Sequence, residues 1–411
     1  MNNSLGNSNN LKAASQRTIR NHNYRLILKL IKNDGPISRA ELAKKANVSG
    51  PTVSKIIDHF MELELVKEGK PTESSGGRKP IPLIFNSSAG YVLGIDVGGT
   101  NIKAALANLD GEIVDEFNLA SEELGVGQAA IDNLAKFIND IIEKNNFNKD
   151  KIVRIGIVVP GVTNIFSGVV SNAPAFGWQD IRIKELLEDK LEIPVSIEND
   201  VNAAAFAEKE IGNGQDYSSL IFMSIGTGIG LGLILNNELY RGSNFAAGEV
   251  GYTIIDIEWF NNEDIEDPGK SFGCLESMAA APGIVKMAQD LNIIEEIANK
   301  NNISKFEVSS KDIINYAKAN NEKALKLIDD LTTYLAAGIV NISVLINPEA
   351  IFLSGGVMEA GDILLNRIKE KVSKVSPFSP DIMISSFRSD ASLEGALALA
   401  AKDARQDLLL Q

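Results

Sequence analysis

The chain is poor in the residues that build disulfide and metal sites. Its 411 residues include one cysteine, Cys274, and two histidines, His22 and His59. A single cysteine excludes an internal disulfide framework and fits a reducing cytoplasm. Both histidines lie before residue 90, so the rest of the chain has no histidine for catalysis or metal binding.

Long apolar segments are also scarce. No apolar run approaches the roughly 18 residues that cross a bilayer. The polar N-terminus lacks the apolar stretch of a signal peptide, and residues 1–15 are rich in Asn and Ser. We therefore expect a cytoplasmic protein without a membrane partner, and a disordered segment over residues 1–15.

The net charge of −14 hides a strong asymmetry. Residues 1–90 hold 14 Lys and Arg against 7 Asp and Glu, a net of +7, and the remainder holds 26 against 47, a net of −21. DNA phosphates attract the first segment and repel the second. Any DNA contact should therefore belong to residues 1–90 alone.

Residues 16–88 carry the pattern of a winged helix-turn-helix domain. Ser38-Arg39-Ala40-Glu41 is a capping box that opens a short helix, and Ser49 caps a second helix that runs to about residue 63. The second helix of such a pair enters the major groove. A strand over residues 65–69 then leads into a wing or hinge rich in Gly, Ser and Pro.

Short polar and basic side chains on this domain are the candidate DNA contacts, whereas the apolar positions of the second helix form its buried stripe. The candidates are Ser38, Arg39, Ser49, Thr52, Ser54 and Lys55, with Arg78 and Lys79 in a flexible basic arm. The expected stripe is Val53, Ile56, Ile57 and Phe60. Two alternatives stay open: a helical protein-interaction domain, and a plain linker in place of the basic arm.

From residue 89 the pattern is that of an α/β fold. Three predicted strands each end in a glycine turn, and two of these strand–turn–strand units, about 130 residues apart, suggest duplicated lobes. Glycines let backbone N–H groups approach phosphate, and a carboxylate can hold hydrated Mg²⁺. The candidate nucleotide-binding residues are Asp96, Gly98, Gly99, Thr100, Lys103, Gly226, Thr227, Gly228, Gly355 and Gly356. The alternative is three purely structural turns.

Eight segments give the chain a family resemblance. They are DVGGTNIK, VVPG, SNAPAFGW, ENDVNAAAFAE, SIGTGIGLG, AAGEVGY, GCLE and FLSGGV. Together they resemble the ROK family (repressors, open reading frames and kinases), in its branch of xylose and N-acetylglucosamine repressors. The resemblance implies a two-lobed, actin-like (ribonuclease H-like) sugar-kinase fold behind the winged helix-turn-helix. It places a small lobe at residues 89–200, completed by a helix at 392–408, and a large lobe at 201–391.

The same resemblance implies a sugar site. Its candidate residues are Asn172, Asn199, Asp200, Glu249, Tyr252 and Glu276. Asp200 stands where the kinases keep the base that deprotonates the accepting hydroxyl. Amide and carboxylate groups can satisfy the many donors and acceptors of a sugar. The alternative, a solvated acidic face, fits poorly with the apolar residues around Glu249 and after Asp200.

Two departures from the family pattern bear on metal binding. Tyr252 stands where the family usually has a histidine, and Cys274 alone remains of a three-cysteine pattern that spans residues 266–274. One thiol without histidine cannot form a four-ligand tetrahedral site. We therefore predict no structural zinc, and we expect the Tyr252 hydroxyl to take part of the sugar contact.

These observations favour a sugar-responsive transcriptional regulator, a repressor of carbohydrate (xylose-type) genes that reads an operator as a homodimer or a dimer of dimers. An unphosphorylated sugar would close the cleft between lobes and change the spacing of two DNA-reading heads. The alternative is an ATP-dependent, Mg²⁺-assisted sugar kinase with Asp200 as base. A scaffold with a vestigial kinase fold is the third reading.

Overall fold

The chain divides into two compact units. The computed structural model describes residues 16–70, 81–144, 148–173, 176–261, 273–387 and 390–409. The first unit holds the chain up to Tyr91, with Asn108–Glu112 and the residues from Ala401 onward. The second holds Val92–Ala107 and Ile113–Ala400. The segment predicted to be disordered, residues 1–15, lies outside the described residues.

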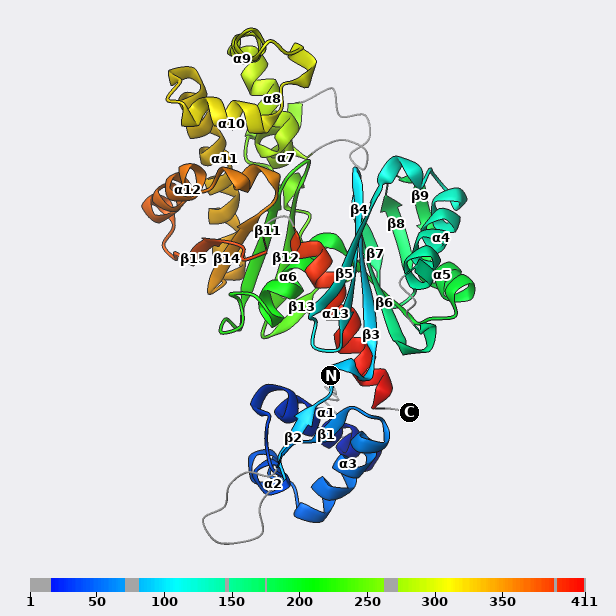
Figure 1. Cartoon of the computed structure of the whole chain (residues 1–411). Coiled ribbons are helices and arrows are strands. Elements are labelled where there is room, and N and C mark those ends of the chain that lie inside the picture. Colours follow the sequence, from blue (N-terminus) through cyan, green and yellow to red (C-terminus); the bar gives the residue numbers. More distant parts are fainter. Residues whose placement is uncertain are drawn as a thin grey trace, which may run out of the picture. The chain divides into compact units, whose positions relative to one another are not determined.

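The first unit contains the predicted winged helix-turn-helix (Figure 1). Its elements are α1 (Gln16–Asp34), α2 (Arg39–Ala46), α3 (Gly50–Glu62), β1 (Val66–Glu68) and β2 (Leu83–Phe85). The capping box forms as predicted, because Ser38 Oγ accepts from the Glu41 N–H and the Glu41 carboxylate accepts from Ser38. Ser49 caps α3 by accepting from the Thr52 N–H.

Apolar faces of α1 and α3 build the core of this unit. The predicted stripe of α3, Val53, Ile56, Ile57 and Phe60, is buried. The helices α1 and α3 are in contact, with the ring of Tyr24 edge-on to that of Phe60 at 5.5 Å, and Ile27, Leu28 and Ile31 of α1 are buried as well. The strands β1 and β2 pair antiparallel from Val66–Phe85 to Glu68–Leu83, which makes the wing, while residues 71–80 at its tip lie outside the described residues.

Two distant segments complete the first unit. Lys32 of α1 forms an ion pair with Asp110 at 3.1 Å, and the Arg405 guanidinium donates to the Leu109 carbonyl oxygen at 2.7 Å. Arg25 donates to Gln406 at 3.1 Å. The helix α13 (Ala391–Leu408), which the sequence assigns wholly to a small lobe, therefore begins in the second unit and ends in the first.

The second unit is built on two five-stranded sheets. The first has the order β10-β6-β3-β4-β5 and the second β13-β12-β11-β14-β15. The first comprises β3 (Tyr91–Val97), β4 (Asn101–Asn108), β5 (Ile113–Ala120), β6 (Ile152–Val159) and β10 (Val195–Asn199). The second comprises β11 (Leu220–Ile225), β12 (Ile229–Leu235), β13 (Glu238–Tyr240), β14 (Ala350–Ser354) and β15 (Asp381–Ile384). The predicted pair of strand–turn–strand units is thus β3–β4 in one sheet and β11–β12 in the other.

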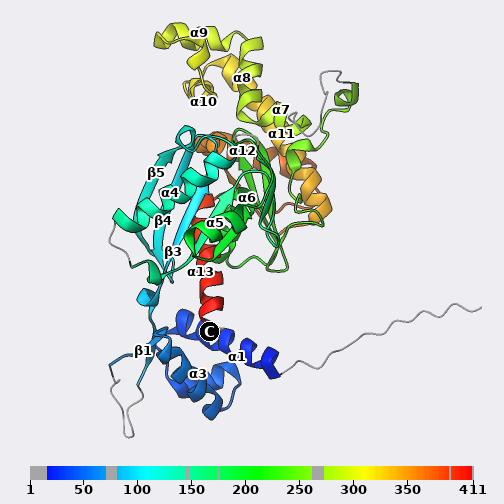
Figure 2. The ribbon, with the colours of Figure 1, turned by 90° about the vertical axis from the view of Figure 1, so that its right-hand side faces the viewer.

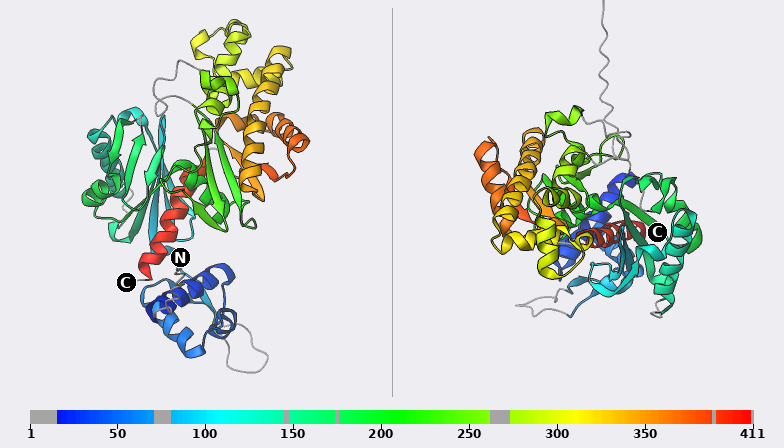
Figure 3. Two further views of the ribbon diagram at one scale, coloured as in Figure 1. Left: turned by 180° about the vertical axis from the view of Figure 1, so that it is seen from behind. Right: turned by 90° about the horizontal axis from the view of Figure 1, so that it is seen from above.

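Helices pack in layers against these sheets. Figure 1, and Figure 3 from behind, show α6 (Asp200–Glu210) and α13 between the two sheets. Figure 2 shows α4 (Gln128–Lys144) beside β4 and β5 of the first sheet. Figure 1 shows α4 and α5 (Ile183–Leu191) near the small sheet of β7 (Val162–Asn164), β8 (Val169–Ala173) and β9 (Trp178–Ile181). The remaining helices belong to the second sheet's side: α7 (Cys274–Ala279), α8 (Ala281–Asp290), α9 (Ile293–Asn301), α10 (Ser310–Lys318), α11 (Glu322–Ile346) and α12 (Asp362–Val375).

The helix α11 is long and apolar enough to cross a membrane by length and composition, which the search for apolar runs does not predict. Its apolar residues are instead buried in the core of the second unit. These include Leu327, Leu331, Leu335 and Ile339, each with no exposed surface. Burial of this kind is typical of a core helix rather than a membrane span.

Small residues allow α13 to approach its neighbours closely. A Cβ on Gly156 of β6 would lie 2.2 Å from the Ala396 carbonyl oxygen, and a Cβ on Gly395 would lie 2.2 Å from the Ala203 carbonyl oxygen of α6. Both distances are shorter than atoms can tolerate. Glycine is therefore required at both positions for α13 to lie between β6 and α6.

Candidate functional site

The first glycine turn lies between β3 and β4 in the second unit. Gly99 and Thr100 are exposed, and a Cβ on Gly98 would lie 2.7 Å from the Asn101 carbonyl oxygen, so the turn needs glycine there. Lys103 forms an ion pair with Asp390 at 2.6 Å. Burial raises the pKa of Asp96 to about 7, the negative charges of Asp200 and Asp390 add to this shift, and Lys103 opposes it.

The second and third glycine turns lie side by side. The strands β11 and β14 pair in parallel up to Ser224 and Ser354, so their turns leave the same end of the sheet. Gly355 adopts a φ of +92°, and a Cβ there would lie 2.4 Å from the Ile225 carbonyl oxygen. The Gly226 N–H donates to the Gly228 carbonyl oxygen at 2.9 Å. The structure thus brings the second and third predicted turns together. The turn after β3 is related to the site by the electrostatic interaction between Asp96 and Asp200.

Asn199 and Asp200 sit at the junction of β10 and α6. The Asn199 side chain caps α6, because its Oδ1 accepts from the N–H groups of Val201 and Asn202, both at 3.0 Å. Its Nδ2 donates to Asp200 Oδ1 at 2.9 Å and to the Gly161 carbonyl oxygen at 3.0 Å. Asn199 therefore fixes the orientation of Asp200.

The environment of Asp200 raises its pKa above the ordinary value of 3.8. Burial raises its pKa to about 6, although hydrogen bonds from the backbone at Val201 and Asp200 and from the Asn199 side chain favour the charged form. A carboxylate at the start of a helix is also stabilised by the helix dipole. The raised pKa shows that desolvation dominates at this position.

Glu276 and Glu249 face the same region from the second sheet's side. Glu276 Oε1 accepts from the Ile229 N–H at 2.8 Å, and a Cβ on Gly251 would lie 3.2 Å from the Glu276 carboxyl carbon. The pKa of Glu249 is raised by burial and then by the charges of Glu276 and Asp200. Three of the predicted sugar-binding carboxylates thus lie close enough to influence one another.

The remaining predicted sugar residues lie at the edge of this cluster. Tyr252 and Asn172 are exposed. The Asn172 backbone lies against Gly161, where a Cβ would be 1.9 Å from the Asn172 carbonyl oxygen. Glu249 is exposed, so its apolar sequence neighbours do not shield the whole side chain as expected, although the groups around its carboxylate partly desolvate it. Its surroundings crowd the carboxylate without covering the side chain.

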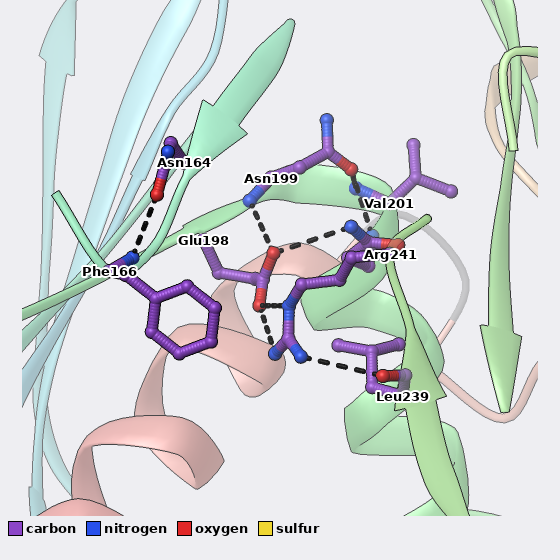
Figure 4. A network of polar contacts seen from close by, with 8 residues as sticks. Asn164, Phe166, Glu198, Asn199, Val201, Leu239 and Arg241 are labelled. Carbon is purple, nitrogen blue, oxygen red and sulfur yellow. Dashed lines mark hydrogen bonds and ion pairs between the residues drawn. The ribbon is translucent and has the colours of Figure 1, made fainter. Parts of the chain in front are cut away.

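Three further groups shape the site without having been predicted. Gly161, with a φ of +90°, offers its carbonyl to Asn199, and Asp390 pairs with Lys103. Arg241 forms a buried ion pair with Glu198, next to Asn199 (Figure 4). Gly161 could have been found from the VVPG segment, and Arg241 lies five residues before the AAGEVGY segment without being part of it, whereas Asp390 lies far from every quoted segment.

The sequence and the fold match known proteins over nearly the whole chain. The ROK family model matches residues 92–403, and a winged helix-turn-helix DNA-binding model matches residues 20–67. The chain belongs to the ROK family.

Relatives of this ROK protein include repressors and kinases. A protein named "Xylose repressor" from Bacillus spizizenii is 34% identical over 88% of this chain and 88% of its own length. A "Glucokinase" from Halalkalibacterium halodurans is 33% identical over 68% of this chain and 84% of its own length. A crystal structure of a ROK family transcriptional regulator, a homologue of the Escherichia coli MLC protein, superposes with a TM-score of 0.82 at 26% identity over 95% of this chain and 98% of that chain.

Some of the predicted DNA-contacting side chains of this ROK protein are exposed, and others already interact with other residues of the protein. Thr52 and Lys55 of α3 are exposed, and Ser54 is half-buried. Ser38 and Ser49 act as helix caps, with Ser49 Oγ 2.8 Å from Thr52 Oγ1. Arg39 forms ion pairs with Glu68 at 3.0 Å and with Asp58 at 3.5 Å, which join α2 to β1 and to α3. Arg78 and Lys79 lie outside the described residues.

Asp96 makes the stability of this ROK protein depend on pH. Its pKa is about 7 in the folded chain against an ordinary value of 3.8, so between these values the folded state holds a proton that the unfolded state has released. Stability from this group therefore falls as pH rises from about 4 to about 7 and stays low above that. Asp96→Asn should raise the free energy of unfolding at pH 8 by about 1–3 kcal/mol. Urea unfolding of the wild type and of Asp96→Asn from pH 5 to pH 8 measures this difference. A difference in the free energy of unfolding that does not change with pH would contradict the prediction.

Proposed function

We propose that this ROK protein is a sugar-responsive transcriptional repressor, acting in the cytoplasm on xylose-type genes. The observation that carries the proposal is the convergence of Asp200, Glu249 and Glu276 at a site oriented by Asn199, in a chain whose first unit is a winged helix-turn-helix. The exposed Thr52 and Lys55 of α3 suit a reading helix in the major groove. The relative named "Xylose repressor" supports the same role, with xylose as the sugar.

The chemistry of the site favours an unphosphorylated sugar. Its carboxylates accept hydrogen bonds from sugar hydroxyls, and the Asn199 amide holds Asp200 in place for this. Burial raises the pKa of Asp200, and burial followed by the charges of Glu276 and Asp200 raises the pKa of Glu249, so the site disfavours further negative charge. A phosphate group would add to the repulsion, so the neutral sugar is the better ligand.

The sugar would act by selecting one state of the protein. A ligand shifts an equilibrium only through its different affinities for the two states. We propose that the chain binds its operator as a dimer, and that the sugar-bound state places the two reading helices away from the half-site spacing of about 34–36 Å. The sugar then lowers operator affinity.

The direct test is operator affinity with and without neutral sugars. Xylose, glucose and N-acetylglucosamine are added separately to the full chain on DNA from upstream of its own gene. We expect one of them to raise the Kd for the operator at least about tenfold, equivalent to about 1.4 kcal/mol. The matching sugar phosphates serve as controls and should have weaker effects. An operator Kd unchanged by every sugar that binds would overturn the proposal.

Sugar phosphorylation is the second candidate function. The glucokinase relative and the pKa of Asp200 near 6, which suits a general base close to neutral pH, favour it. Asp96 and the three glycine turns are the groups that would hold Mg²⁺ and ATP. Sugar-dependent ATP consumption, absent in Asp200→Asn, is the measurement that supports this function. A rate that survives the substitution excludes Asp200 as the base.

Structural zinc is not part of this proposal. The family's usual ligands are a histidine and three cysteines, but Tyr252 replaces the histidine and Cys274 is the single cysteine of the chain. Cys274 is buried at the start of α7, and residues 262–272 lie outside the described residues. One thiol does not suit a tetrahedral zinc site.

A further inference from the structure

A buried ion pair lies directly behind the Asn199–Asp200 turn. Glu198, at 2% exposure, is the last residue of β10 before Asn199, and its Oε2 accepts from Nε and Nη2 of Arg241 at 2.8 and 2.5 Å (Figure 4). Arg241 follows β13 of the second sheet, whereas Glu198 belongs to the first. A single charge pair thus joins the two sheets next to the site.

The second oxygen of Glu198 holds the turn on both sides of Asp200. Its Oε1 accepts from the Asn199 N–H at 3.1 Å and from the Asn202 side-chain amide at 3.3 Å. Asn199 in turn orients Asp200 through its side-chain amide, so a shift of the Glu198 carboxylate would also shift Asp200. The Arg241 guanidinium, also donating to the Leu239 carbonyl oxygen at 3.4 Å, fixes that carboxylate.

The backbone of Arg241 is attached to the other half of the site. Its carbonyl oxygen accepts from the Ala247 N–H at 3.1 Å, which closes the loop of residues 241–248. Gly248 ends this loop with a φ of +101° and accepts from the Leu231 N–H at 2.8 Å, and Glu249 follows it. The conformation that presents Glu249 therefore depends on this loop.

An aromatic contact joins the same loop to the small sheet of β7, β8 and β9. The ring of Phe166, between β7 and β8, lies 5.8 Å from the ring of Phe245 in the loop of residues 241–248, at an interplanar angle of 70°. Edge-to-face rings at this distance attract each other. Phe166 lies on the same side of the turn as Glu198 in Figure 4. The ion pair thus ties Arg241 to the first sheet, and the aromatic contact ties the same loop to the small sheet of β7, β8 and β9.

We propose that Arg241 is a positioning residue of the sugar site, which sets the placement of Asp200 relative to Glu249. Its side chain acts on Asp200 through Glu198 and Asn199, and its backbone acts on Glu249 through the loop of residues 241–248. The inference rests on the proposed sugar binding at this site. Arg241 contacts neither carboxylate directly, so its effect reaches the sugar through their relative position.

Sugar affinity of the full chain, measured by calorimetry, tests this role. Arg241→Gln should raise the Kd for the sugar at least tenfold, and Arg241→Lys, which keeps the charge but loses the planar two-point contact, should recover part of the affinity. The double variant Glu198→Gln with Arg241→Gln removes the buried charge of Glu198 together with the half-buried charge of Arg241. It is the variant of choice if Arg241→Gln alone fails to fold.

Glu208 supplies a matched control for a purely structural role. It is a buried carboxylate at the other end of α6, and it accepts from the hydroxyls of Ser385 at 2.6 Å and Ser386 at 2.9 Å. Glu208→Gln should lower the melting temperature and leave the sugar Kd within about twofold. Equal Kd values for wild type, Arg241→Lys and the double variant would overturn the positioning role. A wild type that binds no neutral sugar would instead overturn the proposed function, and this inference with it.

Discussion

Replacing Asp200 by asparagine should weaken sugar binding at least tenfold and, at the same time, make the folded protein more stable. The asparagine keeps an oxygen for the Asn199 amide and the Val201 N–H, which both donate to Asp200 Oδ1. It loses the charge-assisted hydrogen bond to a sugar hydroxyl, which is worth about 1.5–3 kcal/mol. It also removes the cost of a buried charge whose pKa is about 6, so stability at pH 8 should rise by about 1–2 kcal/mol.

A variant that binds sugar more weakly but unfolds less easily has lost a functional carboxylate. Loss of a structural carboxylate would lower the stability instead. Calorimetric titration with the sugar gives the affinity, and urea unfolding at pH 8 gives the stability. Operator affinity without sugar should stay at the wild-type value, because Thr52 and Lys55 belong to the first unit. A variant that loses stability and keeps its sugar affinity would refute the assignment of Asp200 to the sugar site.

Replacing Gly395 by alanine should destabilise the second unit by about 3 kcal/mol. In an ordinary helix interior this substitution stabilises by about 1 kcal/mol, because alanine has the higher helix propensity. Here the new Cβ would lie 2.2 Å from the Ala203 carbonyl oxygen and 2.3 Å from its carbon. Neither is the end of a flexible side chain, so α13 or α6 must move, with the cost of overpacking.

The control for this prediction is Gly356→Ala, where a Cβ would meet nothing within 4 Å. Thermal unfolding of the three proteins should place Gly356→Ala near wild type and Gly395→Ala several degrees lower. A higher melting temperature for Gly395→Ala would mean that α13 does not pack against α6 in the way described.

Local signals explain why much of the fold could be predicted. The capping box at Ser38 and Glu41 involves residues three positions apart, and so does the cap of α3 by Ser49. The glycine turns are local signals too. Gly355, for example, ends its strand with a positive φ that residues other than glycine rarely adopt. Such features are complete within a few residues, so the sequence displays them.

Pairs of distant residues could not be predicted from the sequence. Glu198 and Arg241 are 43 positions apart, and Lys103 and Asp390 are 287 apart. A lone arginine or aspartate carries no local pattern, and its partner is decided only when the sheets assemble. The exposure of Glu249 was misjudged for a related reason, because apolar neighbours in sequence need not cover a side chain in space.

The completion of the first unit by Ala401–Leu409 has a consequence for synthesis. Domains fold as the chain leaves the ribosome, N-terminal parts first. The helices α1 to α3 emerge early, yet Arg405 and Gln406, which bond to Leu109 and Arg25, emerge only after both sheets of the second unit. A nascent chain therefore has its winged helix-turn-helix long before it has the residues 401–409 that complete the first unit. The first unit becomes complete only after residues 113–400 of the second unit have been synthesised.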